Sequence, residues 1–460
     1  MILLLMVAIA VWAQPTGTLD LAPAEIYPFI PLETLTSDST PSFDELTEAP
    51  PENDVSGWHF RLARHYHRRG HPIEAARHAR RAAELQGAEP SHQLFLASIY
   101  CRMQRYELAR TVLAGVLSRQ ELASEGRILL AYILQQTGEM EAQHGLLQEV
   151  LKSDPQNPYA LYLAGVSYFR RNRHENALQT FQAAAVAGLD LAELHFYMGR
   201  IYARDAATFE QAIQAFQLAD RSDRESPELK KELGLIFYRT GRYQEALAEL
   251  RVAVQLQPEF PQAFHIMAQV YQRVSRLEEA GQALARYQEL THNQAVRESN
   301  RRRGQIAYQE GRTQLSEKRL DEASRSFRES LQFLPEKDAS YYALASIHYR
   351  RRKHAQAIEL VRRAITVNPL IADYHILLAE SLDKRGDFRS AIESMQKALL
   401  LSPPRARLSN YLGNLCFRSG DYSCAADAYR AASELEPGNR FYRMNLESAL
   451  RRLAPYESKE

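Results

Sequence analysis

The sequence predicts an all-α fold, an α-solenoid built from helix–turn–helix repeats. The first reason is that one phrase returns along the chain at a spacing of about 34 residues. The second is that the copies contain two amphipathic helical stretches around a short turn, such as YRTGRY or FRSGDY. The third is that proline ends the second stretch in several copies. One hairpin cannot bury its apolar faces alone, so the copies must stack.

The chain begins with an apolar run, MILLLMVAIAVWAQ, that is shorter than the roughly 20 residues a membrane span needs. The small residues Val11 and Ala13 suit a cleavage after Ala13. We therefore interpret residues 1–13 as a secretory signal peptide, which predicts an exported, periplasmic or secreted protein. Because the run contains no Lys or Arg, an uncleaved N-terminal anchor is the alternative.

Residues 14–55 form an acidic segment rich in Pro and Thr. It holds nine Asp or Glu residues, and the first basic residue of the chain is Arg61. Low hydropathy and charge of one sign favour a disordered tail. The chain as a whole has a net charge of only +1, so the repeats are basic. One hypothesis is that the acidic tail lies in a basic groove of the repeats and competes with a partner.

Two positions of each copy, the eighth and the twentieth, hold Gly or Ala in nearly every case. Two antiparallel helices approach closely only where side chains are small, so we expect these positions to meet, for example Gly234 against Ala246. The residues that we assign to this repeat packing are Gly165, Gly199, Gly234, Gly413, Ala177, Ala246, Ala357, Ala391 and Ala425.

The copy that starts at Pro227 carries Gly234, Phe237, Ala246, Leu250, Ala253 and Pro258 at regular intervals. This pattern resembles the tetratricopeptide repeat family. We place eleven such copies, which start near Ser56, Pro90, Ser124, Pro158, Ala192, Pro227, Pro261, Gly304, Asp338, Ala372 and Ala406. The resemblance implies a right-handed superhelical α-solenoid. It also implies a non-catalytic scaffold in which the first helix of each copy lines a concave face.

Some copies depart from the pattern. Gln143 and Tyr287 replace an expected Ala, and the fifth copy has one extra residue near 206–208. About nine residues are added at 295–303, which we interpret as a helical joint: either a lengthened helix or a junction between two stacks. Domain boundaries follow as 56–294 for repeats 1–7, 304–437 for repeats 8–11, and 438–460 for a capping helix and tail.

The resemblance also implies which side chains point into the concave groove. Position 13 is basic in nine of the eleven copies, and positions 5 and 12 are often aromatic. A groove with this lining suits an acidic or extended peptide. The alternatives are that the cations complement helix dipoles and that the aromatic rings pack between repeats. The groove residues that we predict are Arg170, Arg204, Arg239, Arg273, Arg350, Tyr162, Phe169, Tyr238, Tyr308, Tyr342 and Tyr349.

Motifs of catalysis are missing from the sequence. It has no G-x-S-x-G elbow, no phosphate-binding glycine loop and no H-E-x-x-H, so we expect no enzyme, no cofactor and no small-molecule substrate. The paired code of RNA-reading helical repeats is absent, so nucleic acid is not an expected partner. The first copy holds five histidines, but arginines lie between them, so we expect a solvated surface and no metal.

The eleventh copy carries Cys416 and Cys424 on either side of its turn. If the protein is exported, we expect the two cysteines to form a disulfide. In a reducing compartment, we expect them to be two small residues of the core.

The predicted function is capture of a protein or peptide partner on the concave face, in the bacterial cell envelope. The alternative is a cytoplasmic or membrane-anchored adaptor. The family's carboxylate clamp for chaperone C-termini has Lys at position 5 and Asn at position 9 of one copy. Here Lys231 is at position 5, but position 9 of the same copy is Leu235, so a clamp of this type is disfavoured. Self-association is compatible with solenoid edges.

Overall fold

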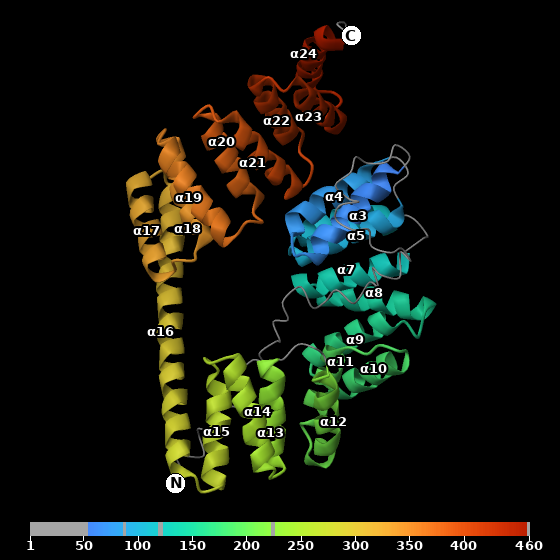
Figure 1. The fold of residues 1–460 in the computed structure, drawn as a ribbon, viewed down its shortest axis with the longest axis vertical. Coiled ribbons are helices and arrows are strands. Elements are labelled where there is room, and N and C mark those ends of the chain that lie inside the picture. The colour runs from blue at the N-terminus through green and yellow to red at the C-terminus, as the bar shows by residue number, and fades with distance from the viewer. Residues whose placement is uncertain (1–53, 86–88, 118–122, 222–225, 458–460) are drawn as a thin grey trace. The chain divides into compact units, whose positions relative to one another are not determined.

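A computed structural model describes residues 54–85, 89–117, 123–221 and 226–457. The predicted signal peptide and nearly all of the acidic segment lie outside the described residues. Within them, every regular element is a helix, and the fold is the all-α repeat solenoid that the sequence predicts (Figure 1). No described helix combines the length and the apolar character needed to cross a membrane.

The helices follow one another as antiparallel pairs. The described pairs in the first half are α3 (Val55–Arg68) with α4 (Pro72–Glu84), α5 (Pro90–Arg102) with α6 (Tyr106–Leu117), α7 (Ala123–Thr137) with α8 (Met140–Ser153), α9 (Pro158–Arg170) with α10 (His174–Val186), α11 (Ala192–Tyr202) with α12 (Phe209–Ala219), and α13 (Pro227–Arg239) with α14 (Tyr243–Leu256). The chain continues through α15 (Pro261–Arg273), α16 (Leu277–Ser316), α17 (Leu320–Phe333), α18 (Asp338–Arg350) with α19 (His354–Val367), α20 (Ala372–Asp383) with α21 (Phe388–Leu400), α22 (Ala406–Ser419) with α23 (Tyr422–Leu435), and the terminal α24 (Arg440–Glu457).

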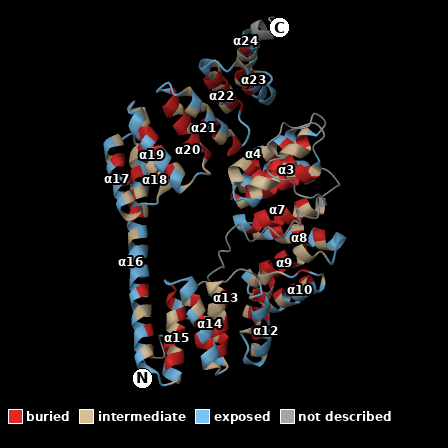
Figure 2. Cartoon of the chain, in the orientation of Figure 1, coloured by how far each residue is buried: buried red, intermediate tan, exposed pale blue. Residues whose placement is uncertain are grey.

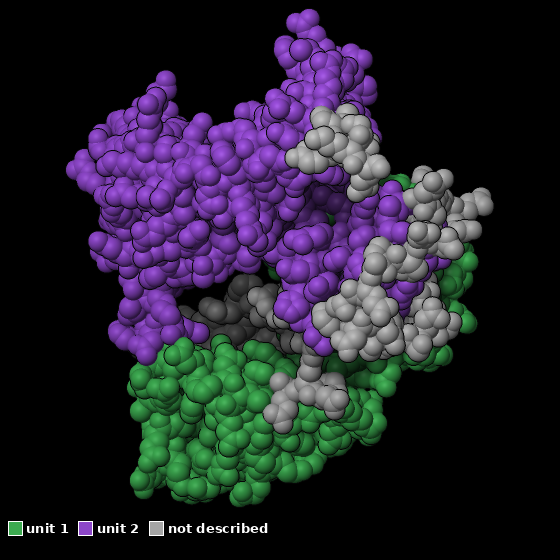
Figure 3. Space-filling model, turned by 45° about the horizontal axis from the view of Figure 1, so that its top comes forward, with its two compact units in different colours: residues 1–39, 93–106, 112–291 green, residues 40–92, 107–111, 292–460 purple. Residues whose placement is uncertain are grey.

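The chain divides into two compact units (Figure 3). Among the described residues, the first unit comprises 93–106, 112–117, 123–221 and 226–291, and the second comprises 54–85, 89–92, 107–111 and 292–457. Buried residues lie mainly on the helix faces that meet within and between pairs (Figure 2). The core therefore runs along each stack and has no single centre, as expected for a repeat protein.

The small residue at position 8 makes room for the side chain at position 24 of the same copy. A Cβ on Gly165 would lie 2.5 Å from Cε1 of Phe181, and one on Gly234 would lie 2.5 Å from Cγ of Leu250. Gly234 also lies against Ala246, as predicted, since a Cβ on Gly234 would be 3.3 Å from the backbone carbonyl oxygen of Ala246. Gly199 and Gly413 make the same room for Phe216 and Tyr429.

Position 20 is buried throughout. The predicted packing residues there, which have no exposed surface, are Ala177, Ala246, Ala357, Ala391 and Ala425. Gln143, which replaces Ala in the third copy, is equally buried, and its Nε2 donates to Oε1 of Gln135 at 2.9 Å. The larger side chain is thus held by a hydrogen bond along the hairpin.

The extra residue of the fifth copy forms a 3-10 turn, Ala206–Thr208, between α11 and α12. The added residues 295–303 lie inside α16, a single helix of 40 residues. The described chain therefore passes from the seventh copy to the eighth without a turn. Residues 292–299 of this helix are exposed. Figure 2 shows much of α16 in pale blue.

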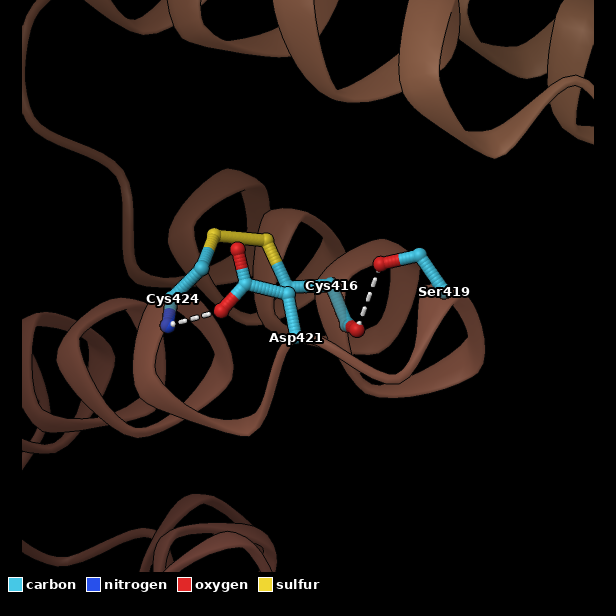
Figure 4. The surroundings of a disulfide bond; sticks show 4 residues. All are labelled: Cys416, Ser419, Asp421 and Cys424. Carbon is cyan, nitrogen blue, oxygen red and sulfur yellow. Dashed lines mark hydrogen bonds between the residues drawn. A yellow bond between two sulfur atoms is a disulfide. The ribbon is translucent and has the colours of Figure 1, made fainter.

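A disulfide joins Cys416 near the end of α22 to Cys424 near the start of α23 (Figure 4). Their Cα atoms are 5.7 Å apart, within the range that a disulfide bridges. Next to the bond, Oδ1 of Asp421 accepts from the backbone N–H of Cys424 at 2.9 Å, which caps the first turn of α23. The bond therefore closes the turn of the last repeat.

Candidate functional site

The basic residues at position 13 lie at the last turn of the first helix of their copies. Arg170, Arg239, Arg273 and Arg350 end α9, α13, α15 and α18, and Arg204 follows the end of α11. All five side chains are exposed. A cation at this end of a helix complements the partial negative charge of its last carbonyl groups.

Two of these arginines, together with Arg418, also join neighbouring copies. Nη1 of Arg239 donates to the carbonyl oxygen of Ala203 at 3.1 Å, and the hydroxyl of Tyr238 hydrogen-bonds Arg273 and raises its pKa. Arg418 forms the same kind of contact with the buried carboxylate of Asp383. In each case position 13 of one copy reaches position 12 of the copy before it. The predicted groove residues Arg239 and Arg273 therefore hold repeats in register.

Arg170 and Arg204 differ from Arg239 and Arg273, because neither makes a hydrogen bond or an ion pair within the described residues. Arg200, on the same helix face, lies with its guanidinium carbon 5.3 Å from the ring centre of Phe169. The ring of Phe169 is in turn 5.0 Å from that of Tyr197. We call this group, Arg170, Arg200, Arg204, Phe169 and Tyr197, the arginine patch.

The charges of these arginines act on two neighbouring rings: Arg200 and Arg204 on His174, and Arg170 and Arg200 on Tyr197. Burial first, then the charges of Arg204 and Arg200, lower the pKa of His174. Burial raises the pKa of Tyr197, and Arg170 and Arg200 oppose that rise. One carboxylate, Glu193, also acts on Tyr197, so the positive charge there exceeds the negative. The patch can accept an anionic group beside an aromatic surface.

Sequence reasoning missed Arg200 and Tyr197. They occupy positions 9 and 6 of the fifth copy. Position 9 lies on the first helix of its copy, which the family resemblance places on the concave face, so a search of all positions of that helix would have included Arg200. No sequence signal distinguished Tyr197 from an ordinary packing residue.

The aromatic stripe is mainly packing. Tyr162 is only 6% exposed, packs against Phe181 with ring centres 5.9 Å apart, and its pKa is raised well above the usual value by burial. Its prediction as a groove-lining residue is therefore wrong: position 5 points into the core here. Tyr238 is half-buried beside Tyr243, with ring centres 6.2 Å apart.

In the second unit, the predicted aromatic residues lie among carboxylates. The ring of Tyr342 is 5.0 Å from that of Tyr374, and Tyr349 contacts His354. Burial and then the charge of Glu380 raise the pKa of Tyr349. Lys337 lies 4.9 Å from the ring centre of Tyr308. Arg350 is exposed without a partner in the described residues, but the surface around it has mixed charge.

The histidines of the first copy are partly packed and not simply solvated. Nδ1 of His59 lies 2.9 Å from Nδ1 of His78, and the ring of Tyr66 stacks on His78. Burial lowers the pKa of His78 to about 4. Among the described residues, no three His, Cys, Asp or Glu side chains are grouped so that they could hold a metal ion.

Lys231, the residue nearest to a chaperone clamp, is engaged within its own helix. Its Nζ lies 2.9 Å from a carboxylate oxygen of Glu228 and 3.0 Å from one of Glu232. These two ion pairs occupy the ammonium group. The geometry thus agrees with the sequence in disfavouring a clamp at this position.

Comparison with known families assigns the chain directly. A family model described as tetratricopeptide repeat matches residues 140–188, 301–373 and 376–440, and a second, described as TPR repeat, matches residues 234–275. The chain belongs to the tetratricopeptide repeat family. Proteins of this family are typically non-catalytic scaffolds, and the repeat architecture makes this chain a scaffold for protein interaction.

Individual relatives are distant. The chain is 21% identical over 209 residues to a DnaJ homolog subfamily C member 7 homolog of Dictyostelium discoideum. The match covers 42% of this chain and 39% of that protein, so the chain spans well under half the length of this relative.

Two solved structures illustrate the structural likeness. YrrB, described as a TPR protein with an unusual peptide-binding site, is 20% identical, with a TM-score of 0.36, over 39% of this chain and 91% of YrrB. PilF of Pseudomonas aeruginosa is 21% identical, with a TM-score of 0.28, over 47% of this chain and 95% of PilF.

Proposed function

We propose that the chain is an exported scaffold of the bacterial cell envelope that captures an acidic protein or peptide segment on the concave face of its superhelix. The arginine patch is the proposed anchor. Its guanidinium groups would orient carboxylates of the partner, while Phe169 and Tyr197 would supply apolar contact. Arg239, Arg273 and Arg418 would act indirectly, because their hydrogen bonds to the preceding copy fix the spacing of the repeats.

The observation that carries this proposal is that three neighbouring arginines have no ion-pair partner in the described residues. Arg170 and Arg200 belong to two consecutive first helices, and Arg204 follows the end of the second. Arg200 lies beside the ring of Phe169, and none of the three arginines has an ion-pair partner in the described residues. Other arginines, such as Arg242 with Glu245, form ion pairs. Unpaired cations beside partly exposed rings are the features that recognise an acidic ligand.

Two features support export. The first is the apolar start of the chain with its small residues before Gln14. The second is the Cys416–Cys424 disulfide, since disulfides persist in oxidising compartments. Mass spectrometry of the mature N-terminus tests this part. A start at Gln14 supports export, and a retained Met1 favours the anchored or cytoplasmic adaptor.

The binding proposal is tested by affinity capture from envelope extract. The bait is the full chain, beside a variant with Arg170→Glu, Arg200→Glu and Arg204→Glu. A matched control carries Arg325→Glu, Arg328→Glu and Arg362→Glu, three exposed arginines on second helices. A partner held by the chain and the control but lost by the first variant supports the proposal. The same partners on all three baits would contradict it.

A further inference from the structure

Position 3 of a copy normally packs against the preceding copy. The contact is visible between the eighth and ninth copies, where Oγ of Ser340 and Oγ of Ser330 are 3.0 Å apart. Ser340 is at position 3, and Ser330 is at position 27 of the copy before it. The residues at position 3 that are at most 6% exposed are His92, Ala160, Leu194, Leu229, Ala263, Ser340 and Tyr374.

The eighth copy breaks this rule, because Ile306 at position 3 is 53% exposed. The cause is the continuous helix α16. The residue that would cover Ile306 is Tyr287, at position 27 of the seventh copy, but it belongs to the same helix α16 and not to a preceding antiparallel helix. The ring of Tyr287 packs instead against His265, with ring centres 4.8 Å apart. This explains why a large residue replaces the usual Ala at this position.

The uncovered face carries a cavity of about 890 Å³ between α16 and the end of α17. Ile306, Phe333 and Leu334 form the apolar part of its lining, and Arg297, Arg301, Arg302 and Lys337 form the cationic part. Two acidic residues, Glu298 and Glu336, also line it, so cations outnumber carboxylates two to one. The cavity thus offers an apolar face surrounded by positive charge.

We propose that residues 26–53 of this same chain dock in the cavity and cover the exposed edge of the eighth copy. Two properties of the segment match the lining. It contains six Asp or Glu residues and no Lys or Arg, and it begins with the apolar sequence IYPFIPL. Carboxylates would meet the arginines of α16, and the apolar island would cover Ile306, much as a capping element covers the open end of a repeat stack.

This docking would be an intramolecular contact that protects the fold. It is separate from partner capture at the arginine patch. By covering an apolar edge that another molecule could otherwise use, the segment would keep the chain from associating through this face. Because the segment belongs to the same chain, a free peptide of this sequence must compete with it for the cavity.

The test is a fluorescence anisotropy titration with a labelled synthetic peptide of residues 26–53. The first protein is the full mature chain. The second is the same chain with its own segment neutralised by Asp38→Asn, Asp44→Asn, Glu45→Gln and Glu48→Gln. We expect the peptide to bind the neutralised chain about tenfold more tightly, because the tethered competitor is weakened.

The site is then tested in the neutralised chain. Arg297→Glu, Arg301→Glu and Arg302→Glu should weaken peptide binding about tenfold or more, and so should Ile306→Gln, which changes no charge. A control variant carries Arg389→Glu, Arg451→Glu and Arg452→Glu, at exposed positions outside the cavity. It changes the net charge by the same amount as the cavity variant and should bind the peptide with unchanged affinity. Circular dichroism checks that every variant keeps its helix content.

Three outcomes would overturn the proposal. The first is equal peptide affinity for the native and the neutralised chain. The second is an equal loss of affinity in the cavity variant and the charge-matched control. The third is concentration-dependent dimerisation of the native chain in sedimentation velocity that the cavity variant abolishes, since the occupant would then belong to a second copy.

Discussion

At the scale of single residues, positions 8 and 24 of a copy are coupled. In the copies that carry Phe or Tyr at position 24, namely Phe181, Phe216, Phe327 and Tyr429, position 8 is Gly. Where position 24 is smaller, as with Leu113 and Val361, position 8 can be Ala. The sequence predicted small residues at position 8, but not which side chain they accommodate, because two antiparallel helices can meet in several registers.

We predict that Gly165→Ala destabilises the chain by about 1–3 kcal/mol, since the new Cβ would overlap the buried ring of Phe181. The second substitution Phe181→Leu should recover part of this loss by removing the overlap. Thermal unfolding followed by circular dichroism measures both effects. Gly145→Ala, at a glycine with no atom near the added carbon, is the control and should not lower the midpoint.

At the scale of elements, helix starts were highly predictable. The starts that we placed at Pro158, Ala192, Pro227, Pro261, Asp338, Ala372 and Ala406 coincide with the first residues of α9, α11, α13, α15, α18, α20 and α22. They are predictable because proline and the periodic small residues act locally. The cavity beside α16 was not predictable from the sequence. The added residues indicate a longer helix, but they do not indicate which neighbouring face this helix leaves uncovered.

The first hairpin, α3 with α4, should lose stability as the pH falls. Burial lowers the pKa of His78 to about 4, below its usual value near 6.5, so the folded state favours the neutral ring. Stability is then complete above pH 6.5 and decreases as the unfolded state takes up protons between pH 6.5 and 4. After allowance for solvent screening, we expect a loss of about 1 kcal/mol between pH 7 and 5.

Hydrogen exchange of α3 and α4, corrected for the intrinsic dependence on pH, measures this effect. His78→Phe keeps an aromatic ring beside Tyr66 and should remove most of the dependence. Equal sensitivity to pH in the native chain and the variant would contradict the assignment to His78.

The last hairpin, α22 with α23, should depend on its disulfide. By the chain-entropy account, closing a loop of eight residues stabilises the folded hairpin by about 2–3 kcal/mol. Reduction, or Cys424→Ala, should therefore increase hydrogen exchange in α22, α23 and α24 and leave α18 and α19 unchanged. Unaltered protection after reduction would show that packing alone holds the hairpin.

At the scale of the whole molecule, the fold could be predicted from the sequence and the binding surface only in part. Repetition amplifies a weak signal, because each copy repeats the same packing. The position-13 arginines illustrate the limit: Arg239 and Arg273 bond to the preceding copy, whereas Arg170 and Arg204 do not. This difference depends on residues in neighbouring copies, which one repeat position alone does not reveal.

The central claim is that the arginine patch selects acidic segments. A random peptide library selected on the full chain, and in parallel on the Arg170→Glu, Arg200→Glu and Arg204→Glu variant, tests it most directly. The account predicts that the full chain enriches peptides rich in Asp and Glu that also carry an apolar residue, and that the variant does not. Enrichment of neutral or basic peptides, or of the same acidic peptides on both proteins, would contradict it.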